Sequence, residues 1–321
     1  MKTRALVLAA GKGKRMQSDR NKVLHRILGK TVIEFVIDFL AIEEIERTGI
    51  VVGEHNIEDI KLLFGDRVDY ILQSEPKGTG HAVMCAEKWL IDFDGNLLVV
   101  VGDAPFLDKK TIRDLIQRFE TGKYACVLLS AIFDSPPAYG RIVRNHNHDL
   151  VKIVEEKDAT DQEKRITEVS SSHYCFSKSK LFTALKMISN TNEQNEYYLP
   201  DVIGVFIKNG ESVEAIPVDD PMVTFGINSR KDLLHGIQKL RERISSFWLE
   251  NGVTIIDPLT TYIDATVKIG KDSLIHPFSY IANGSKIGKN CEIGPYAYIE
   301  RSTVSDNTRL AWTKMSNNQK G

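Results

Sequence analysis

The feature that most constrains the fold is an isoleucine that recurs every six residues near the C-terminus. It occupies seven consecutive positions of one grid: Ile263, Ile269, Ile275, Ile281, Ile287, Ile293 and Ile299. A six-residue period is typical of a parallel β-helix, in which each hexad supplies one short strand and a turn. Three hexads make one coil, so residues 252–308 are predicted to form two to three coils. Because the next grid position is Ser305 and the period stops, we expect residues 309–321 to be a polar tail.

A single helix is predicted immediately before these repeats, over residues 229–251. Apolar side chains from Leu233 to Trp248 fall on one stripe at helical spacing. Ser229 followed by Asp232 resembles an N-cap arrangement, and Gly252 suits the end of a helix. We interpret this segment as the connection between two domains.

Residues 1–228 alternate short apolar runs with helical patterns. The predicted strands are Ala5–Ala10, Gly49–Val52, Tyr70–Leu72, Asn96–Val101 and Tyr124–Ala131, and the predicted helices are Thr31–Ile42, Gly80–Leu90 and Thr111–Phe119. This alternation predicts βαβ units, hence an α/β domain with a mostly parallel, Rossmann-like sheet. In such sheets ligands bind beyond the carboxyl ends of the strands. The functional site is therefore expected in the loops that follow Ala10, Leu72 and Val101.

Bulk charge and cysteine usage exclude several classes of function. The 42 basic residues balance 43 acidic ones, so neither nucleic acid nor a membrane surface is an expected partner. The four cysteines form no C-x-x-C pair, which disfavours a zinc site and a disulfide framework. The apolar run Ala5–Ala10 is too short for a signal peptide or a membrane span. We expect a cytoplasmic protein.

A basic, glycine-rich turn follows the first predicted strand. It runs from Leu8 through Ala9, Ala10, Gly11, Lys12, Gly13 and Lys14 to Arg15 and Met16, with Lys22 close behind. Glycines let backbone N–H groups approach a phosphate closely, and Arg15 and Lys22 can neutralise its charge. The segment lacks the full Walker A pattern and the third glycine of a dinucleotide fingerprint. Its alternative interpretation is a solvated basic turn.

Two further strand ends carry polar residues. In Gln73–Ala82, the small run Gly78-Thr79-Gly80 leaves backbone and a hydroxyl free, and the amide of Gln73 offers the donor and acceptor that a pyrimidine edge requires. In Val101-Gly102-Asp103, a carboxylate follows a buried strand, where Mg²⁺ is commonly held. Either segment could instead be an ordinary turn with a cap.

The ordered motifs resemble the sugar nucleotidyltransferase family, in particular the uridyltransferase half of bifunctional N-acetylglucosamine-1-phosphate uridyltransferase/glucosamine-1-phosphate acetyltransferases. The matching segments are Leu8–Lys22, Lys22–His25, Gln73–Ala82, Gly102-Asp103, Tyr139–Ile142, Ile153–Ala159, Asn195–Tyr198 and Gly226–Asn228. In that family a long helix and a left-handed β-helix follow the transferase domain, as predicted here. The resemblance implies Mg²⁺-dependent joining of UTP to a sugar-1-phosphate, with no protein nucleophile.

The resemblance also implies a role for each matching residue. Those implied to line the nucleotide are Leu8, Ala9, Ala10 and Gly11, with Gln73, Gly78 and Thr79 reading the uracil and Val101 and Gly102 beside it. Arg15 and Lys22 are implied as the catalytic cations, and Asp103 and Asn228 as the metal ligands. Gly140 and Glu155 are implied to contact the sugar, and Ser170 and Asn228 are further implied substrate-binding residues. Outside the resemblance, Glu155 would be a solvated charge and Asn228 a helix cap.

Two positions depart from the family. Ser170 stands where the family has an asparagine that helps to hold the sugar, and Val101 stands where it usually has tyrosine. N-acetylglucosamine-1-phosphate is therefore the leading acceptor, and the alternatives are another sugar phosphate, dTTP, or a paralogue that binds nucleotide-sugars without catalysis. The family's acetyl-transfer residues lie beyond the end of this sequence, so no acetyl transfer is expected. The family also suggests a homotrimer formed through the β-helix.

Overall fold

The computed structural model describes residues 2–317 and divides into two compact units. One consists of Met1–Leu24 with Ile33–Gly226, and the other of His25–Val32 with Ile227–Gly321. The predicted division was a contiguous domain over residues 1–228. The structure differs in one respect, because the short segment 25–32 groups with the C-terminal residues rather than with its neighbours in sequence.

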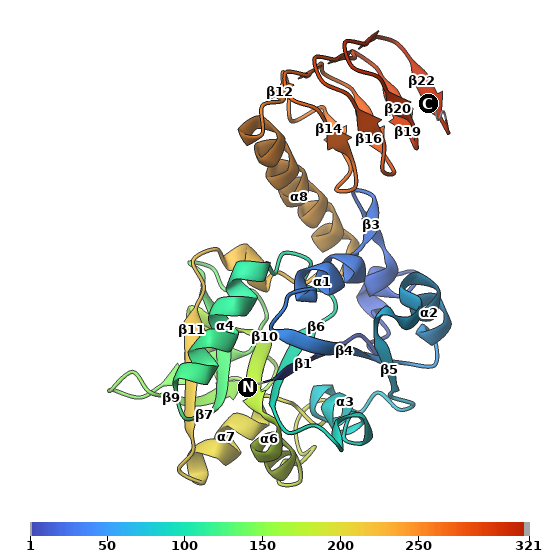
Figure 1. Cartoon of the computed structure of the whole chain (residues 1–321). Helices are drawn as coiled ribbons and strands as arrows, with labels where there is room; N and C mark the ends of the chain where they lie inside the picture. The colour runs from blue at the N-terminus through green and yellow to red at the C-terminus, as the bar shows by residue number, and fades with distance from the viewer. Residues whose placement is uncertain (1, 318–321) are drawn as a thin grey trace. The chain divides into compact units, whose positions relative to one another are not determined.

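The N-terminal unit is built on one large sheet (Figure 1). Its strands lie in the order β11 (Ser212–Pro217), β7 (Tyr124–Ile132), β10 (Glu168–Ser177), β6 (Asn96–Val101), β1 (Thr3–Leu8), β4 (Ile45–Val52) and β5 (Asp69–Leu72). Strand β1 pairs in parallel with both β6 and β4, whereas β10 is antiparallel to both of its neighbours. Strands β8 (Arg141–Arg144) and β9 (Leu150–Val154) form an antiparallel pair attached to β10. The predicted α/β fold with a mostly parallel sheet is confirmed.

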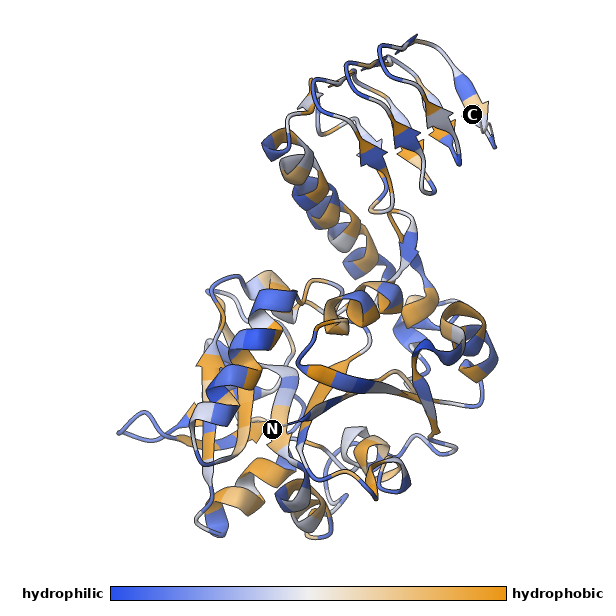
Figure 2. Cartoon of the chain, viewed as in Figure 1, coloured by the Kyte–Doolittle hydropathy of each residue, from blue (hydrophilic) through white to orange (hydrophobic). Residues whose placement is uncertain are grey.

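Helices bury both faces of this sheet because its strands are apolar on both sides. One face packs against α1 (Val32–Leu40), α2 (Ile57–Phe64) and α4 (Lys109–Thr121), and the other against α3 (Thr79–Met84), α6 (Lys178–Leu185) and α7 (Asp201–Lys208). Within β1, Leu6 belongs to one core and Ala5 and Val7 to the other, as the two-residue period of a strand requires. Figure 2 shows much of β7 and β11 in the hydrophobic colour, whereas β4 and β10 also carry hydrophilic stretches. The remaining short helices are α5 (Asp161–Lys164), η1 (Lys14–Met16), η2 (Lys22–Leu24), η3 (Gly65–Arg67), η4 (Lys88–Leu90) and η5 (Pro221–Thr224).

The long helix of the C-terminal unit is α8, Arg230–Glu250. Its N-terminus is capped by Ser229, whose hydroxyl accepts the backbone N–H of Asp232 at 3.2 Å. At its other end the chain turns through Asn251 and Gly252, where φ is +83°. The helix and its cap are therefore as the sequence predicted.

The repeats fold into a parallel β-helix with three sheets. These are β12-β15-β18-β21, β13-β16-β19-β22 and β14-β17-β20. Their strands are β12 (Thr254–Ile255), β13 (Tyr262–Ile263), β14 (Lys268–Ile269), β15 (Leu274–Ile275), β16 (Tyr280–Ala282), β17 (Lys286–Ile287), β18 (Glu292–Ile293), β19 (Tyr298–Glu300), β20 (Thr303–Val304), β21 (Arg309–Leu310) and β22 (Lys314–Ser316). All seven grid isoleucines are buried, and Ile263, Ile281 and Ile299 stack in register, 18 residues apart. The predicted hexapeptide architecture is confirmed.

The predicted end of the coils at residue 308 is wrong. Strands β21 and β22 continue the sheets, pairing Leu310 with Ile293 and Met315 with Ile299. These partners are 17 and 16 residues apart instead of 18, so a strict six-residue grid misses them. Both side chains are partly buried against the isoleucine core, which is why the coil persists without isoleucine. Residues 318–321 of the predicted tail lie outside the described residues.

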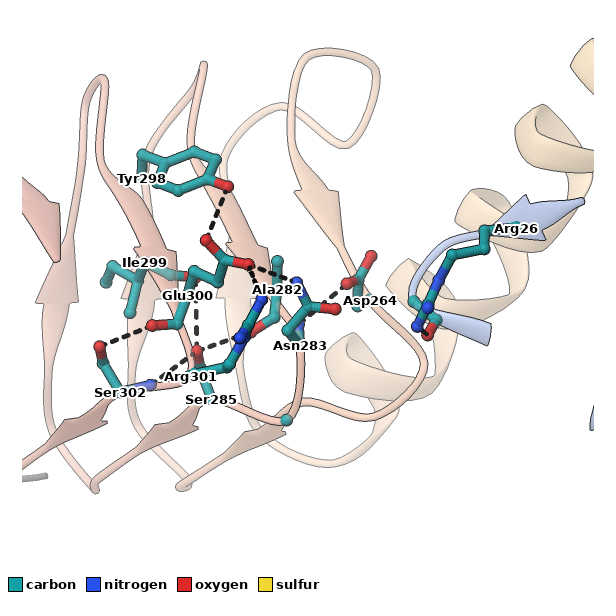
Figure 3. Close-up of polar contacts among 12 residues, drawn as sticks. Arg26, Asp264, Ala282, Asn283, Ser285, Tyr298, Ile299, Glu300, Arg301 and Ser302 are labelled. Atoms are coloured by element: carbon teal, nitrogen blue, oxygen red, sulfur yellow. Dashed lines mark hydrogen bonds and ion pairs between the residues drawn. The ribbon is translucent and has the colours of Figure 1, made fainter. Parts of the chain in front are cut away.

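Polar side chains join three successive coils at one corner of the β-helix (Figure 3). The backbone N–H of Asn283 donates to the Asp264 carboxylate at 2.9 Å, and its side-chain amide donates to Glu300 at 2.7 Å. Tyr298 and Arg301 also donate to the Glu300 carboxylate. The ladder satisfies the buried carboxyl of Asp264 and fixes the stacking of neighbouring coils.

The hairpin of β2 (Arg26–Ile27) and β3 (Lys30–Thr31) packs on the first coil. The carbonyl of Leu28 accepts the N–H of Ala265 at 2.9 Å. At Gly29, φ is +90°, and a Cβ there would lie 2.9 Å from Asp264. Glycine is required by both the backbone conformation and this close approach. Such long-range packing explains why the segment groups with the C-terminal unit.

Candidate functional site

The candidate site begins where strand β1 ends. Because β1 lies between β6 and β4, the residues that follow Leu8 emerge beside those that follow Val101, its register partner. The N–H of Gly102 donates to the carbonyl of Leu8 at 2.9 Å. A Cβ at Gly102 would stand 3.2 Å from both Ala9 Cβ and Leu8 O, so only glycine allows this approach without adjustment.

The glycine-rich turn folds back over Lys22. Gly13 has φ of +65°, and a Cβ there would lie 2.8 Å from the Lys22 Cβ. This close packing holds the turn against the short helix η2 that begins at Lys22. The sequence prediction of a compact, basic turn after the first strand agrees with this geometry.

Lys22 and Asp103 form an ion pair at the carboxyl edge of the sheet. Their side chains are only 19% and 11% exposed, so the two charges are held in a partly desolvated position. Asp103 follows β6 and Lys22 follows the glycine-rich turn, which makes the pairing a product of the strand order β6-β1. A cation and a carboxylate, side by side, suit a ligand that carries both phosphates and a divalent ion.

The second predicted loop contributes an amide that is fixed in orientation. Gln73 is buried, and its amide N–H groups lie 3.2 Å from the Gly78 carbonyl and 3.0 Å from Nδ1 of His81. Gln73 Oε1 accepts no hydrogen bond from the described residues. Thr79 accepts the N–H of Leu199 at 3.0 Å. At Gly78, φ is +102°, and a Cβ would lie 2.5 Å from the Tyr197 carbonyl, so this position also requires glycine.

One pocket of about 210 Å³ brings most of these residues together. The predicted site residues that line it are Leu8, Ala10, Gly11, Lys22, Gln73, Gly78, Thr79, Val101 and Asp103. Pro76, Ala82 and Glu196 complete the lining. Three loops that are far apart in the sequence thus converge at the carboxyl edge of the sheet, where ligands of α/β proteins bind.

Gly140, Glu155 and Ser170 form a second group around strands β8, β9 and β10. The Gly140 carbonyl accepts the N–H of Ser170 at 2.8 Å, and a Cβ at Gly140 would stand 3.5 Å from Glu155 Oε1. The Ser170 hydroxyl lies 3.2 Å from that of Tyr174. These three residues therefore lie close together, and their implied roles at the sugar stay predictions.

The carboxyl of Glu155 sits in an unfavourable electrostatic environment. Burial, followed by the charges of Asp201, Asp158 and Glu196, raises its pKa. A carboxyl in this position holds its proton to higher pH than usual and can then donate as well as accept a hydrogen bond. Glu196 also lines the main pocket, so it connects the two groups.

Besides Gly140, Glu155 and Ser170, four predicted site residues do not line the pocket. Ala9 and Gly102 lie just behind it as backbone supports. Arg15 is exposed in η1 and makes no ion pair or hydrogen bond with the described residues. Asn228 belongs to the C-terminal unit, where its N–H donates to Asp232 at 3.1 Å. The roles of Arg15 and Asn228 stay predictions.

Sequence reasoning did not single out three residues that shape the site. Glu196 lines the pocket, His81 orients Gln73, and His173 is a fully buried imidazole near Asp103 whose pKa burial lowers to about 4. Glu196 and His81 lie within the matched motifs, so a signal existed for both. His173 follows a run of three serines with no recognisable pattern, and only its place in β10 reveals its surroundings.

The side chains of this site could hold a divalent ion only if substrate phosphates supply further ligands. Among residues 2–317, no three His, Cys, Asp or Glu side chains gather as a metal cage. Mg²⁺ commonly binds through one or two carboxylates together with waters and substrate phosphates. A buried Asp103 already balanced by the ammonium of Lys22 fits that mode, with Asp103 as the ligand in this unit. In the same described part of the chain, no helix has the length and apolarity needed to cross a membrane.

Comparison with known proteins identifies a family for each of the two parts of the chain. Residues 5–193 match the MobA-like NTP transferase domain, and residues 266–301 match the bacterial transferase hexapeptide repeat. The chain is 41% identical to the bifunctional protein GlmU of Shouchella clausii over 281 residues, which cover 88% of this chain and 62% of that protein. It is 42% identical to GlmU of Clostridium botulinum over 307 residues, covering 95% and 64%. It thus spans about three fifths of the length of these curated relatives.

A solved structure supports the fold. A Bacillus anthracis protein assigned as a glucose-1-phosphate thymidylyltransferase, in complex with sucrose, superposes with a TM-score of 0.63 and 18% identity, covering 74% of this chain and 94% of that one. The match to the MobA-like NTP transferase domain covers 189 of the 321 residues, which is more than half of the chain. The chain belongs to the family with a MobA-like NTP transferase domain, and it resembles the uridyltransferase half of GlmU with its hexapeptide region.

Proposed function

We propose that this chain is a Mg²⁺-dependent uridylyltransferase, which forms a UDP-sugar and pyrophosphate from UTP and a sugar-1-phosphate. The observation that carries the proposal is the single pocket that gathers the glycine-rich turn, the Lys22–Asp103 pair and the Gln73–Thr79 loop. N-acetylglucosamine-1-phosphate is the leading acceptor, as it is the substrate that the family resemblance implies.

The reaction is a phosphoryl transfer without a protein nucleophile. A phosphate oxygen of the sugar-1-phosphate forms a bond to the α-phosphorus of UTP, and the bond from that phosphorus to the bridging oxygen breaks as pyrophosphate leaves. Backbone N–H groups at Gly11 and beyond bind phosphate oxygens, and Lys22 and Arg15 offset the negative charge that develops. The chain therefore contributes positioning and fixed positive charge.

A bound Mg²⁺ would supply further charge neutralisation at the phosphates. Asp103 is the residue of the N-terminal unit that would hold it, because its carboxylate lines the pocket. Its ion pair with Lys22 would be replaced by a contact with the metal, and Lys22 would then contact the phosphates. Asn228 is proposed as a second ligand on the basis of the family resemblance alone.

Recognition of the base is assigned to Gln73, Gly78 and Thr79. The bond from Gln73 to His81 fixes which end of the amide faces the pocket. The close approach of Gly78 to the Tyr197 carbonyl leaves no room for a side chain there, so Gly78 can offer a base only its backbone groups. A uracil edge, with its alternating acceptors and donor, complements a fixed amide and exposed backbone groups.

A different sugar phosphate is the second candidate for the acceptor, and Ser170 is the observation that favours it. Its hydroxyl is already within 3.2 Å of the Tyr174 hydroxyl and 3.3 Å of the Ser172 N–H. It is therefore engaged within the protein and has a shorter reach than the family's asparagine. An acceptor that needs no amide contact at this side would be tolerated.

The test is a pyrophosphate-release assay on the 321-residue chain. UTP and dTTP are each paired with N-acetylglucosamine-1-phosphate, glucosamine-1-phosphate and glucose-1-phosphate, with Mg²⁺ or EDTA. We expect turnover with UTP and N-acetylglucosamine-1-phosphate only when Mg²⁺ is present. Preference for another pair would replace the named substrates, and nucleotide binding without any turnover would favour a non-catalytic protein.

Two further expectations accompany this proposal. The chain is expected to show no acetyl transfer from acetyl-CoA to glucosamine-1-phosphate, and thiol release in that assay would contradict it. A homotrimer through the β-helix is expected, since Phe278, Tyr296 and Trp312 form a stacked ladder that is 52%, 49% and 74% exposed. Light scattering that gives a monomer mass at micromolar concentration would exclude the trimer.

A further inference from the structure

The loop that follows strand β4 packs directly beneath the start of the phosphate-binding turn. Since β4 is the neighbour of β1, its loop Gly53–Asn56 emerges next to Ala9. The Asn56 side-chain amide donates to the Ala9 carbonyl at 2.9 Å, while its Oδ1 accepts the Gly53 N–H at 2.9 Å. Asn56 is 1% exposed, so this clamp is shielded from water.

Asn21 makes a second clamp one turn further along. Its amide donates to the Gly11 carbonyl at 2.9 Å, and its Oδ1 accepts the Val23 N–H at 3.1 Å. Asn21 is 6% exposed and directly precedes Lys22. It therefore links the glycine-rich turn to the segment that carries the catalytic lysine.

His55 completes this arrangement from the β4 loop. Its Nε2 lies 3.0 Å from the Asn21 side-chain nitrogen. The Gly11 carbonyl and the Val23 N–H fix the orientation of the Asn21 amide, so a hydrogen of that nitrogen faces Nε2. In the tautomer that carries the ring proton on Nδ1, Nε2 of the neutral imidazole accepts this hydrogen.

Two observations support a neutral, closely fitted ring. Partial burial, followed by the charge of Lys12, lowers the pKa of His55, and a hydrogen bond with the Gly11 backbone acts in the opposite direction. A Cβ at Gly53 would lie 2.5 Å from Cε1 of the ring, so the absence of a side chain at Gly53 makes room for the imidazole. Neither His55 nor Asn21 lines the pocket, so any effect on a ligand must pass through the turn.

We infer that His55 is a positioning residue for the proposed nucleotidyl transfer, holding Asn21 so that the Gly11 turn and Lys22 keep a fixed spacing around the nucleotide phosphates. The inference rests on the proposed function, since it takes the turn as the phosphate site. Its physical basis is a chain of hydrogen bonds whose middle member, Asn21, is buried, while His55 contacts it from an exposed position. Loss of a positioning contact lowers rates steeply because reacting groups tolerate only small displacements.

The test compares variants that separate ring volume from hydrogen bonding. His55→Phe keeps a ring but cannot accept, whereas His55→Gln restores an acceptor that can face Asn21. Asn21→Ala removes the side chain that lies between His55 and the Gly11 carbonyl. The matched control is His146→Phe, at an exposed histidine in another loop. For each variant, kcat and KM for UTP, KM for the sugar phosphate, the UTP dissociation constant and the melting temperature are measured.

We expect His55→Phe to lower kcat/KM for UTP by about 10- to 100-fold. The sugar-phosphate KM and the melting temperature should change little, His55→Gln should recover most of the loss, and His146→Phe should match the wild type. Asn21→Ala should resemble His55→Phe, and the double variant should be no worse than either. Wild-type behaviour of His55→Phe, no recovery in His55→Gln, or additive losses in the double variant would each overturn the inference.

The dissociation constant separates failure of this inference from failure of the proposed function. If the wild type binds UTP but does not turn over, the proposed function fails, and the inference is still judged by whether His55→Phe weakens UTP binding and His55→Gln restores it. If the wild type neither binds nor turns over UTP, both are overturned. If His55→Phe does not fold, Asn21→Ala and His55→Gln give the same comparison.

Discussion

The two units of this chain are specified in opposite ways. In the β-helix, one residue type repeated at a fixed interval sets most of the architecture, because isoleucines of successive coils pair in register. In the N-terminal unit, the proposed site depends on single residues that occur once, such as the Lys22–Asp103 pair and the amide of Gln73. The comparison teaches that redundancy protects the fold of one unit, whereas the chemistry of the other has no substitute residue.

The sharpest test of this contrast is Arg15→Ala, for which we expect the largest effect. Arg15 is exposed and makes no ion pair or hydrogen bond with the described residues, so its removal should leave the melting temperature nearly unchanged. As a proposed catalytic cation, it should lower kcat by roughly 10²- to 10³-fold, or about 3–4 kcal/mol. Steady-state pyrophosphate release measures the effect, with the exposed Arg20→Ala as control. Rates near wild type would remove Arg15 from the mechanism.

The converse prediction concerns Ile281→Ala in the β-helix. Ile281 is fully buried between Ile263 and Ile299, and truncation leaves a cavity among its neighbours. The free energy of unfolding of the C-terminal unit should fall by about 2–5 kcal/mol, whereas turnover of the folded enzyme should persist. Urea denaturation followed by tryptophan fluorescence measures it. Ile256→Ala, at a 56% exposed position, should have little effect.

A pair of glycine variants compares the packing of the two units. At Gly288 in the β-helix, a Cβ would lie 2.4 Å from Asp306 Oδ1 and 2.5 Å from its backbone nitrogen, so Gly288→Ala should destabilise the unit by about 1–3 kcal/mol. At Gly204 in helix α7, a Cβ would meet nothing within 4 Å, so Gly204→Ala should stabilise by about 0.5–1 kcal/mol. Opposite shifts in melting temperature are expected. Equal shifts would contradict the difference in packing.

The smallest expected effect is a pH dependence of the stability of the N-terminal unit. Burial, followed by the charge of Asp158, raises the pKa of Asp201 to about 6. Because the unfolded chain releases this proton at lower pH than the folded one, the side chain lowers stability as pH rises from about 4 to 6. Asp201→Asn should remove that decline, giving a gain well below that of the other variants at pH 7. Melting curves from pH 4 to pH 7 measure it, and identical profiles would refute the assignment.

The sequence predicted the parts of this protein that repeat or alternate. The isoleucine grid, the helix capped by Ser229 and the strand–helix alternation each reflect a local period, which packing reinforces. It also identified most pocket residues, because loops after neighbouring parallel strands meet at one edge. The coils beyond residue 308 escaped prediction because Leu310 and Met315 depart from the six-residue period.

By itself, then, the sequence determined the two architectures and the loops that carry the site. Only the tertiary structure decided which residues support those loops: His81 behind Gln73, His55 behind Asn21, and the hairpin at Gly29 against Asp264. The physical reason is that a periodic pattern of buried residues can be recognised from residues close together in the sequence. A hydrogen bond between distant segments depends instead on the strand order and on how closely two backbones approach each other.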